Sequence, residues 1–237
     1  MQIAPHLHRI GNDIVAAYLV ETDDGVTVID AGLAGQYREL EAELSSMGRS
    51  VADVRGVVLT HGDGDHIGFA ERLRLQGVPV HVHEEDAARA RGEVSTKPAW
   101  GHLKLGATAR FLWYAGRKGG LRTTPVTEVV TMRDGDVLDL PGAPHIIGLP
   151  GHSPGSVAIH VPLVDAIFVG DALTTRHVLT GAGGPQPAPF TDEPERAIAS
   201  LDRLDGIDAT WVLPGHGTPW NGGSAEALRR VRAVSRA

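Results

Sequence analysis

The chain has 237 residues, a formal net charge of −7 at pH 7 and no cysteine. That length suffices for one well-packed domain or two small ones. No linker-like stretch separates two halves, so we expect a single domain over residues 1–237. The lack of cysteine excludes disulfides, thiolate metal ligands and a cysteine nucleophile. The acidic balance argues against nucleic acid as a partner.

The N-terminus lacks a basic segment followed by an apolar core, so we expect no secretory signal. No apolar run approaches the roughly 20 residues that a membrane-spanning helix needs. The default expectation is a cytoplasmic protein without a membrane partner. The sequence carries no signal for its oligomeric state.

Strands and helices alternate in clusters along the chain. Apolar, β-branched runs predict strands at 15–20, 26–30, 56–60, 78–83, 127–132, 145–149, 156–161, 166–170 and 209–213. Helical spacing of apolar residues predicts helices at 35–47, 66–76, 84–91, 192–204 and 224–235. This order fits an α/β protein in which two sheets pack face to face and helices cover the outside.

Two stretches interrupt the regular pattern. Residues 91–124 contain Trp100, Trp113 and Tyr114, and we expect a helical insertion there. Its aromatic residues either pack an extra helical hairpin onto the core or form an apolar wall or lid over a substrate. Residues 181–189 are rich in glycine and proline, which predicts a loop.

The strand predicted at 56–60 leads into a short segment with four potential metal ligands, His61, Asp63, Asp65 and His66. We expect Gly62 and Gly64 to supply the backbone freedom for a sharp turn there. Helical spacing follows His66, so these residues lie where a strand ends and a helix begins. Imidazole and carboxylate together suit Zn, Fe, Mn or Ni. The alternative is an acidic, glycine-rich surface turn.

Three later residues of ligand type also follow predicted strands: His152, Asp171 and His216. Any one of them alone is more often a hydrogen-bonded structural residue. Their common position, at the carboxyl end of an apolar run, indicates that they meet the residues at 61–66. Together the seven side chains predict a two-metal hydrolase site.

This pattern resembles the metallo-β-lactamase superfamily, from Val15 to about Gly222. Its signature is His-x-His-x-Asp-His, followed by a His, a bridging Asp and a final His. The resemblance implies a four-layer αβ/βα sandwich with the site at one edge. It also implies two metals and their ligands: one held by His61, Asp63 and His152, the other by Asp65, His66 and His216, and Asp171 bridging both.

One residue departs from the signature, because Asp63 stands where the family has its second His. A carboxylate is a harder ligand than imidazole and biases the first site toward Fe or Mn relative to Zn. It also adds negative charge, which should make a bound hydroxide slightly less acidic. We expect two divalent ions per chain, with Zn first and Fe, Mn or Ni as alternatives.

Two further residues are candidates near the metals. By resemblance, Asp30 lies behind the metal ligands and orients the loop that carries them; the alternative is the N-cap of the helix that follows it. His177 lies six residues after Asp171 and is a candidate for substrate contact.

The predicted activity is metal-dependent hydrolysis of an ester, thioester or lactone carbonyl in a small molecule by hydroxide held between two metals. Asp65 and Asp171 are its candidate catalytic residues, Asp65 by orienting the water or moving a proton. The motif at 151–156 resembles the glyoxalase II, lactonase and thioesterase branches. Only about 20 residues follow His216, so we expect no glyoxalase II substrate domain.

Three alternatives compete with this activity, one within the superfamily's hydrolases and two of other classes. A phosphodiesterase or nuclease is disfavoured by the acidic charge. A mononuclear iron persulfide dioxygenase would bind one iron per chain. A non-catalytic metal-binding module is disfavoured because a structural site is usually closed to water.

Overall fold

The computed structural model describes residues 1–94 and 101–235. Within them, seven strands form one sheet in chain order: β1 (Gln2–Ala4), β2 (Leu7–Gly11), β3 (Ala16–Thr22), β4 (Gly25–Ile29), β5 (Val54–Val58), β6 (Val80–His83) and β7 (Val130–Met132). Four strands form the second sheet in the order β13-β10-β9-β8: β8 (His145–Gly148), β9 (Val157–Val161), β10 (Ala166–Gly170) and β13 (Trp211–Pro214). A small hairpin pairs β11 (Thr174–Arg176) with β12 (Gly183–Gln186).

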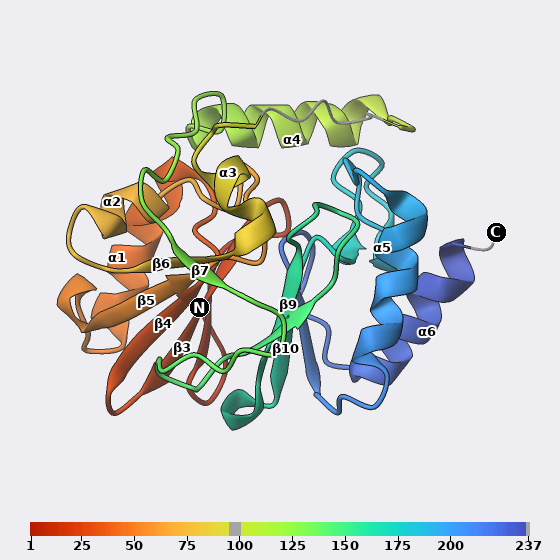
Figure 1. Ribbon diagram of the computed structural model, residues 1–237. Helices are drawn as coiled ribbons and strands as arrows, with labels where there is room; N and C mark the ends of the chain where they lie inside the picture. Colours follow the sequence, from red (N-terminus) through yellow and green to blue (C-terminus); the bar gives the residue numbers. More distant parts are fainter. Residues whose placement is uncertain (95–100, 236–237) are drawn as a thin grey trace.

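The helices cover the outer faces of the two sheets. Figure 1 shows α1 and α2 on the outside of the first sheet and α5 and α6 on the outside of the second. The α-helices are α1 (Tyr37–Ser46), α2 (Ala70–Arg74), α3 (Ala87–Ala90), α4 (Leu105–Arg117), α5 (Pro194–Ser200) and α6 (Ser224–Ser235). The 3₁₀ turns are η1 (Ala34–Gln36), η2 (Val51–Asp53), η3 (Glu84–Asp86), η4 (Pro162–Val164) and η5 (Leu201–Leu204). This is the predicted αβ/βα sandwich.

The central strands, such as β4, β5 and β10, are almost entirely apolar because both faces of each sheet are buried there. Successive strand residues point to opposite faces, so Val57 packs toward α1 and α2 while Val58 packs between the sheets. In the same way Ile167 packs toward α5 and α6 while Phe168 faces the first sheet. Strands buried on both sides therefore appear in the sequence as continuous apolar runs.

Several elements differ from the prediction. The strands β1 and β2 precede the first predicted strand, and β12 lies in the stretch predicted to be a loop. The helix predicted at 66–76 is only α2, since residues 66–69 are held by a neighbouring loop. There the amides of Gly68 and Phe69 donate to the carbonyls of Gly32 and Ala31. The helix predicted at 84–91 begins as the 3₁₀ turn η3 before α3.

Helix α4 lies in the predicted insertion and crosses the top of the molecule in Figure 1. Its inner face is apolar, and Tyr114 packs against Val15 and Leu33. On its outer face Trp113 is 62% exposed, so this aromatic side chain does not pack onto the core. Trp100 lies outside the described residues. The single-domain organisation and the boundaries of the insertion stay predictions.

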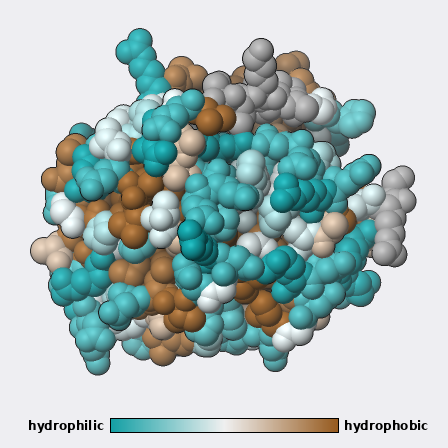
Figure 2. All heavy atoms as spheres, viewed as in Figure 1, coloured by the Kyte–Doolittle hydropathy of each residue, from teal (hydrophilic) through white to brown (hydrophobic). Residues whose placement is uncertain are grey.

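Within the described ranges, no helix combines the length and apolar character required to cross a bilayer. Figure 2 shows one face of the molecule, on which hydrophilic side chains predominate and apolar patches are interspersed.

Candidate metal centre

The seven predicted ligand residues meet where strands of both sheets end. The loop after β5 supplies four of them from the first sheet, and the other three follow β8, β10 and β13 of the second. Between the sheets, His66 Nε2 lies 3.5 Å from Asp171 Oδ1. Within the set from the second sheet, His216 Nε2 lies 3.1 Å from Asp171 Oδ2. His216 Nε2 is also 3.4 Å from Asp65 Oδ2. The strand ends of two separate sheets thus form one cluster.

The cluster divides into two groups, each with ligand atoms within 4.8 Å of one another. The first consists of His61, His152 and Asp171, and the second of Asp65, His66 and His216. Asp63 adjoins the first group, because its Oδ2 lies 3.6 Å from His61 Nε2 and 3.3 Å from His152 Nε2. Each group thus contains residues that the family resemblance assigns to one metal, with Asp171 in the first group and Asp63 beside it.

Each of the four imidazoles is held through Nδ1, which directs Nε2 into the cluster. The Nδ1 partners are Thr60 Oγ1 for His61 at 3.0 Å, Asp30 Oδ2 for His66 at 2.9 Å, Thr191 Oγ1 for His152 at 3.2 Å and the Ile14 carbonyl for His216. Such partners fix the tautomer and the orientation of an imidazole that binds a metal through its other nitrogen.

Three buried atoms in the cluster have no hydrogen-bond partner among the described residues: His61 Nε2, His66 Nε2 and Asp171 Oδ1. Buried polar atoms are nearly always satisfied by protein or water, so an unpaired set facing one point needs an explanation. Divalent cations satisfy imidazole nitrogen and carboxylate oxygen together. The residues present therefore fit a metal centre.

The imidazoles of the cluster are buried, whereas the carboxylates of Asp63 and Asp65 lie at its solvent-exposed edge. His61, His66 and His216 are at most 2% exposed. The side chains of Asp63 and Asp65 are 24% and 28% exposed. Solvent therefore reaches the centre past its two carboxylates.

Asp30 contacts both sides of the ligand loop. Its carboxylate accepts hydrogen bonds from the Thr60 amide at 2.8 Å and from Thr60 Oγ1, and it binds His66 Nδ1. The alternative role as a helix N-cap is wrong, because η1 begins after Leu33 and α1 after Gln36. Asp30 itself adopts a left-handed backbone conformation, with φ of 60°. It is thus placed to orient two residues of the loop.

Gly62 and Gly215 are required for space rather than for backbone freedom. Neither has a positive φ. A Cβ on Gly62 would lie 2.8 Å from the Ala90 amide nitrogen, and one on Gly215 would lie 2.3 Å from His66 Cε1. Gly64 likewise has no positive φ, so the expectation that Gly62 and Gly64 supply special backbone freedom for the turn is wrong. The missing side chain of Gly62 lets α3 approach the loop.

The electrostatics of the metal-free cluster favour the metal-binding forms of His61 and Asp171. Burial, and then the neighbouring His66 and His152, holds the pKa of His61 well below its ordinary value, so its ring is neutral. Burial alone would raise the pKa of Asp171, but the adjacent imidazoles of His216 and His66 hold it well below the usual range. A neutral imidazole and an ionised carboxylate are the states that bind cations. For His66 and His216, burial lowers the pKa but the neighbouring carboxylates outweigh it, so the pKa of both rings is raised.

Two buried charged residues next to the ligand loop, Asp86 and Arg89, were not among the predicted site residues. The Asp86 carboxylate accepts hydrogen bonds from the amides of Gly62 and Gly155 at 2.8 Å and from Ser153 Oγ at 2.7 Å. It thereby joins the 61–66 loop to the loop that carries His152. Arg89 contacts Asp63. Nothing in the helical pattern of 84–91 distinguishes these residues from a solvated surface, where charged side chains usually lie.

A cavity of about 350 Å³ opens beside the carboxylates. Its apolar lining consists of Val15, Leu33, Phe111, Ala115 and Phe190, and Asp63, Gly64 and Asp65 form its polar side. The rings of Phe111 and Phe190 are 6.3 Å apart. A larger hollow of about 960 Å³ around Thr22, Arg55 and Asp139 includes none of the seven predicted ligand residues.

His177 is half-buried and does not line the cavity beside Asp65. Burial and the nearby His216 lower its pKa, so it is neutral. Its contact with substrate stays a prediction.

The comparisons with known proteins identify the family of this chain. Residues 10–216 match the family model described as the metallo-beta-lactamase superfamily. The chain belongs to this superfamily. The match ends at His216, the last of the predicted ligands, and therefore spans all seven.

Two curated relatives cover most of this member of the superfamily. The probable metallo-hydrolase YflN of Bacillus subtilis is 27% identical over 93% of this chain and 87% of its own length. The acyl-coenzyme A thioesterase MBLAC2 of Bos taurus is 30% identical over 90% of this chain and 76% of its own. The chain is therefore a metal-dependent hydrolase of the superfamily.

Solved structures show the same fold. The metallo-beta-lactamase family protein TTHA1429 from Thermus thermophilus superposes with a TM-score of 0.74 at 23% identity, covering 99% of this chain and 81% of that one. TTHA1623, solved in a di-iron-bound form, gives a TM-score of 0.61 at 27% identity, with coverage of 94% and 96%.

Proposed function

We propose that this hydrolase cleaves an ester, thioester or lactone of a small molecule at a dinuclear metal centre. The observation that carries the proposal is the pair of ligand groups around Asp171, whose Oδ1 lies 3.5 Å from His66 and whose Oδ2 lies 3.8 Å from His152. One carboxylate therefore faces both groups, as a bridging ligand would.

The two proposed metal sites take their ligands from both sheets: His61, Asp63, His152 and Asp171 for the first, and Asp65, His66, His216 and Asp171 for the second. Two divalent cations bound there supply a hydroxide at neutral pH and a Lewis acid for the scissile carbonyl oxygen. The ligand set suits Zn first, and the carboxylate of Asp63 also admits Fe, Mn or Ni.

Asp65 is the protein group best placed to act on protons. It belongs to the second ligand group, and its side chain is 28% exposed toward the cavity. A carboxylate there can orient the attacking water and pass a proton to the leaving group. Asp30 keeps His66 and Thr60 fixed while this occurs.

The cavity supports a carbonyl substrate with an apolar acyl group. Its walls place Leu33, Phe111 and Phe190 opposite the carboxylates, so an apolar chain would lie with its carbonyl at the metal centre. The name of MBLAC2, an acyl-coenzyme A thioesterase, agrees with thioester cleavage.

The proposal is tested with Asp171→Asn. We expect elemental analysis of protein purified without added metal to find two ions per wild-type chain and fewer in the variant. Turnover should fall at least about 100-fold, since the bridging ligand is weakened. Activity is measured on a panel of lactone, thioester, phosphodiester and β-lactam substrates, and folding by circular dichroism.

Asp139→Asn is the matched control, because this exposed carboxylate lies outside the cluster and should leave metal content and turnover unchanged. Unchanged activity of Asp171→Asn on any substrate that the wild type cleaves would contradict the bridging role. Turnover of phosphodiesters alone would instead assign a phosphodiesterase.

A further inference from the structure

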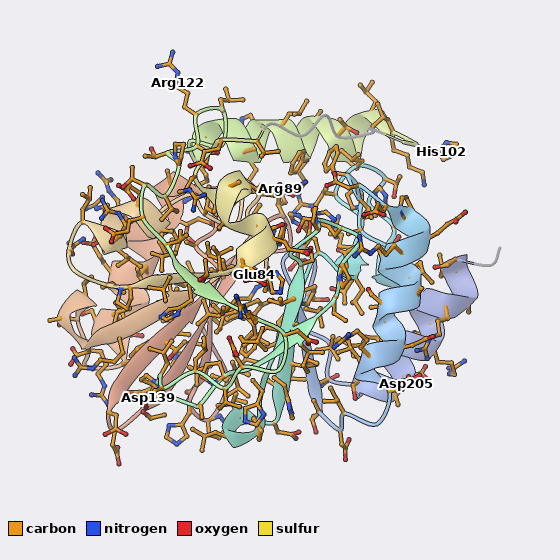
Figure 3. The ribbon with its side chains drawn as sticks, in the orientation of Figure 1. Glu84, Arg89, His102, Arg122, Asp139 and Asp205 are labelled. Atoms are coloured by element: carbon orange, nitrogen blue, oxygen red, sulfur yellow. The ribbon has the colours of Figure 1, made fainter. Side chains whose placement is uncertain are left out.

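Arg89 is a buried cation beside the proposed metal centre. It projects from α3 beneath α4 (Figure 3), and its side chain is only 8% exposed. Its Nη1 donates to Asp63 Oδ1 at 3.0 Å, and its Nη2 pairs with Asp192. A buried guanidinium is costly unless its charge is paired, so these contacts define its role.

The contact divides the two oxygens of Asp63 between different partners. Arg89 takes Oδ1, while Oδ2 faces His61 Nε2 at 3.6 Å and His152 Nε2 at 3.3 Å. The planar guanidinium fixes the direction of a carboxylate through directional hydrogen bonds. Asp63 therefore presents one oxygen to the cluster in a fixed orientation, as a single imidazole nitrogen would be presented.

Arg89 also offsets a charge. The family signature has a neutral His at position 63, whereas Asp63 carries one negative charge, and Arg89 supplies one positive charge next to it. The other carboxylate on Arg89, Asp192, has a side chain 29% exposed, so water screens part of its charge. The negative charge expected from Asp63 is thus not added unopposed to the centre.

The same arginine links Asp63 to the segment that holds His152. The Asp192 amide donates to the His152 carbonyl at 3.1 Å. The preceding Thr191 places its Oγ1 3.2 Å from His152 Nδ1. Arg89 thereby connects Asp63 to the segment at 191–192 that holds His152, and both residues are proposed ligands of the same metal.

We propose that Asp63 and Arg89 act as one unit that takes the place of the signature histidine. Arg89 is the positioning residue: it holds Asp63 as a ligand through one oxygen and cancels its charge. The inference rests on the proposed metal centre. It predicts that Arg89 matters for metal affinity only when position 63 is an aspartate.

The test is a double-mutant cycle of wild type, Arg89→Met, Asp63→His and the double variant. Dissociation constants for Zn²⁺ are measured by competition with a chromophoric chelator. Arg89→Met should weaken one of the two bound ions by about 10–100-fold. Asp63→His should weaken the same ion, because Arg89 then faces an imidazole. The double variant should bind within a few-fold of wild type.

Multiplicative effects of the two substitutions would overturn the proposal, since independent sites do not couple. A loss caused only by damaged packing would also multiply, and it would lower the melting temperature of the metal-free protein equally in both backgrounds. Arg89→Lys keeps the charge without the planar fork. Charge alone does not favour a bound cation, so the affinity of this variant should stay below that of wild type. Full wild-type affinity in Arg89→Lys would overturn the orienting role of the planar guanidinium.

Arg74→Met is the matched control, because Arg74 pairs with Glu71 away from the cluster and should leave both metal affinities unchanged. The measurement also separates the two proposals. If wild type binds two ions and the effects of the two substitutions are simply additive, only the proposed Asp63–Arg89 unit is contradicted. If wild type binds no metal, both the proposed metal centre and the proposed unit are contradicted.

Discussion

At the scale of single residues, Asp86 has the most demanding position outside the ligand set. It is completely buried and accepts hydrogen bonds from Gly62, Ser153 and Gly155. Asp86→Ala should lower the free energy of unfolding by about 3–5 kcal/mol, because three buried donors lose their acceptor. Urea denaturation monitored by circular dichroism measures the change.

Asp86→Asn separates the hydrogen bonds from simple packing. Its amide keeps one acceptor oxygen, so its loss of stability should lie between those of wild type and the alanine variant. Asp139→Ala, at an exposed site, is the control and should change stability by less than about 0.5 kcal/mol. An alanine variant at position 86 that is as stable as this control would contradict the role.

The sequence identifies residues whose types rarely occur so close together in the chain. Two His and two Asp within 61–66 have few explanations other than a cation. Asp86 and Arg89 escape notice because their partners are distant in the chain: Asp86 bonds to Ser153, and Arg89 pairs with Asp192. Local spacing contains no information about a contact made across 67 or 103 positions.

At the scale of elements, α4 determines the shape of the cavity. Phe111 and Ala115 line it from the helix and pack against Val15 and Leu33. Phe111→Ala should reduce kcat/KM about 10–100-fold for thioesters with long acyl chains, since a buried aromatic side chain contributes about 2–3 kcal/mol. Acetyl thioesters, which do not reach the helix, should be cleaved nearly as before.

Leu112→Ala provides the comparison on the same helix, because Leu112 is 45% exposed and does not line the cavity. It should leave the preference for chain length unchanged. An equal loss for short and long acyl chains in Phe111→Ala would show that α4 acts on stability and not on substrate choice. Steady-state kinetics over the chain-length series gives the answer.

Element boundaries were predicted less well than element types. The strands are long apolar runs whose pattern survives burial on both faces, whereas α2 and α3 are cut short by tertiary contacts. Residues 66–69 bond to the loop at 31–32 in place of completing a helix. The strands β1 and β2 were missed because polar residues such as His8 and Arg9 interrupt their apolar pattern, although both side chains are buried.

At the scale of the whole molecule, the two sheets meet in two ways. Between them Tyr18 and Phe168 pack edge to face with ring centroids 5.4 Å apart, and Tyr18 donates to the Pro214 carbonyl at 2.7 Å. At their ends the proposed ligands of the first sheet face those of the second. A cation bound there would join the sheets a second time, so metal binding should stabilise the fold.

Removing metal with a chelator should therefore lower the melting temperature. Binding at 100 times the dissociation constant stabilises a protein by about 2.7 kcal/mol. For a chain of this size that corresponds to a shift of about 5–10 °C. Differential scanning calorimetry is the measurement, and a single transition is expected for the predicted single domain.

Calcium-saturated and calcium-free chelator solutions distinguish metal loss from a direct effect of the chelator. Asp171→Asn should show a much smaller shift than wild type, because it holds less metal. A melting temperature that is the same with and without chelator would contradict a centre shared by the two sheets.

The buried imidazoles and the exposed carboxylates of the cluster have a consequence for the order in which metal and substrate bind. The four imidazoles are buried behind Asp63 and Asp65, and because Arg89 offsets the charge of Asp63, Asp65 makes the entrance of the metal-free protein negative. Cations are drawn toward such an entrance and anions are turned away. Cations bound there would offset the negative charge of the entrance, so anionic reactants would be repelled less than from the metal-free protein. If the proposed metal centre forms, metal binding would therefore precede the binding of an anionic substrate.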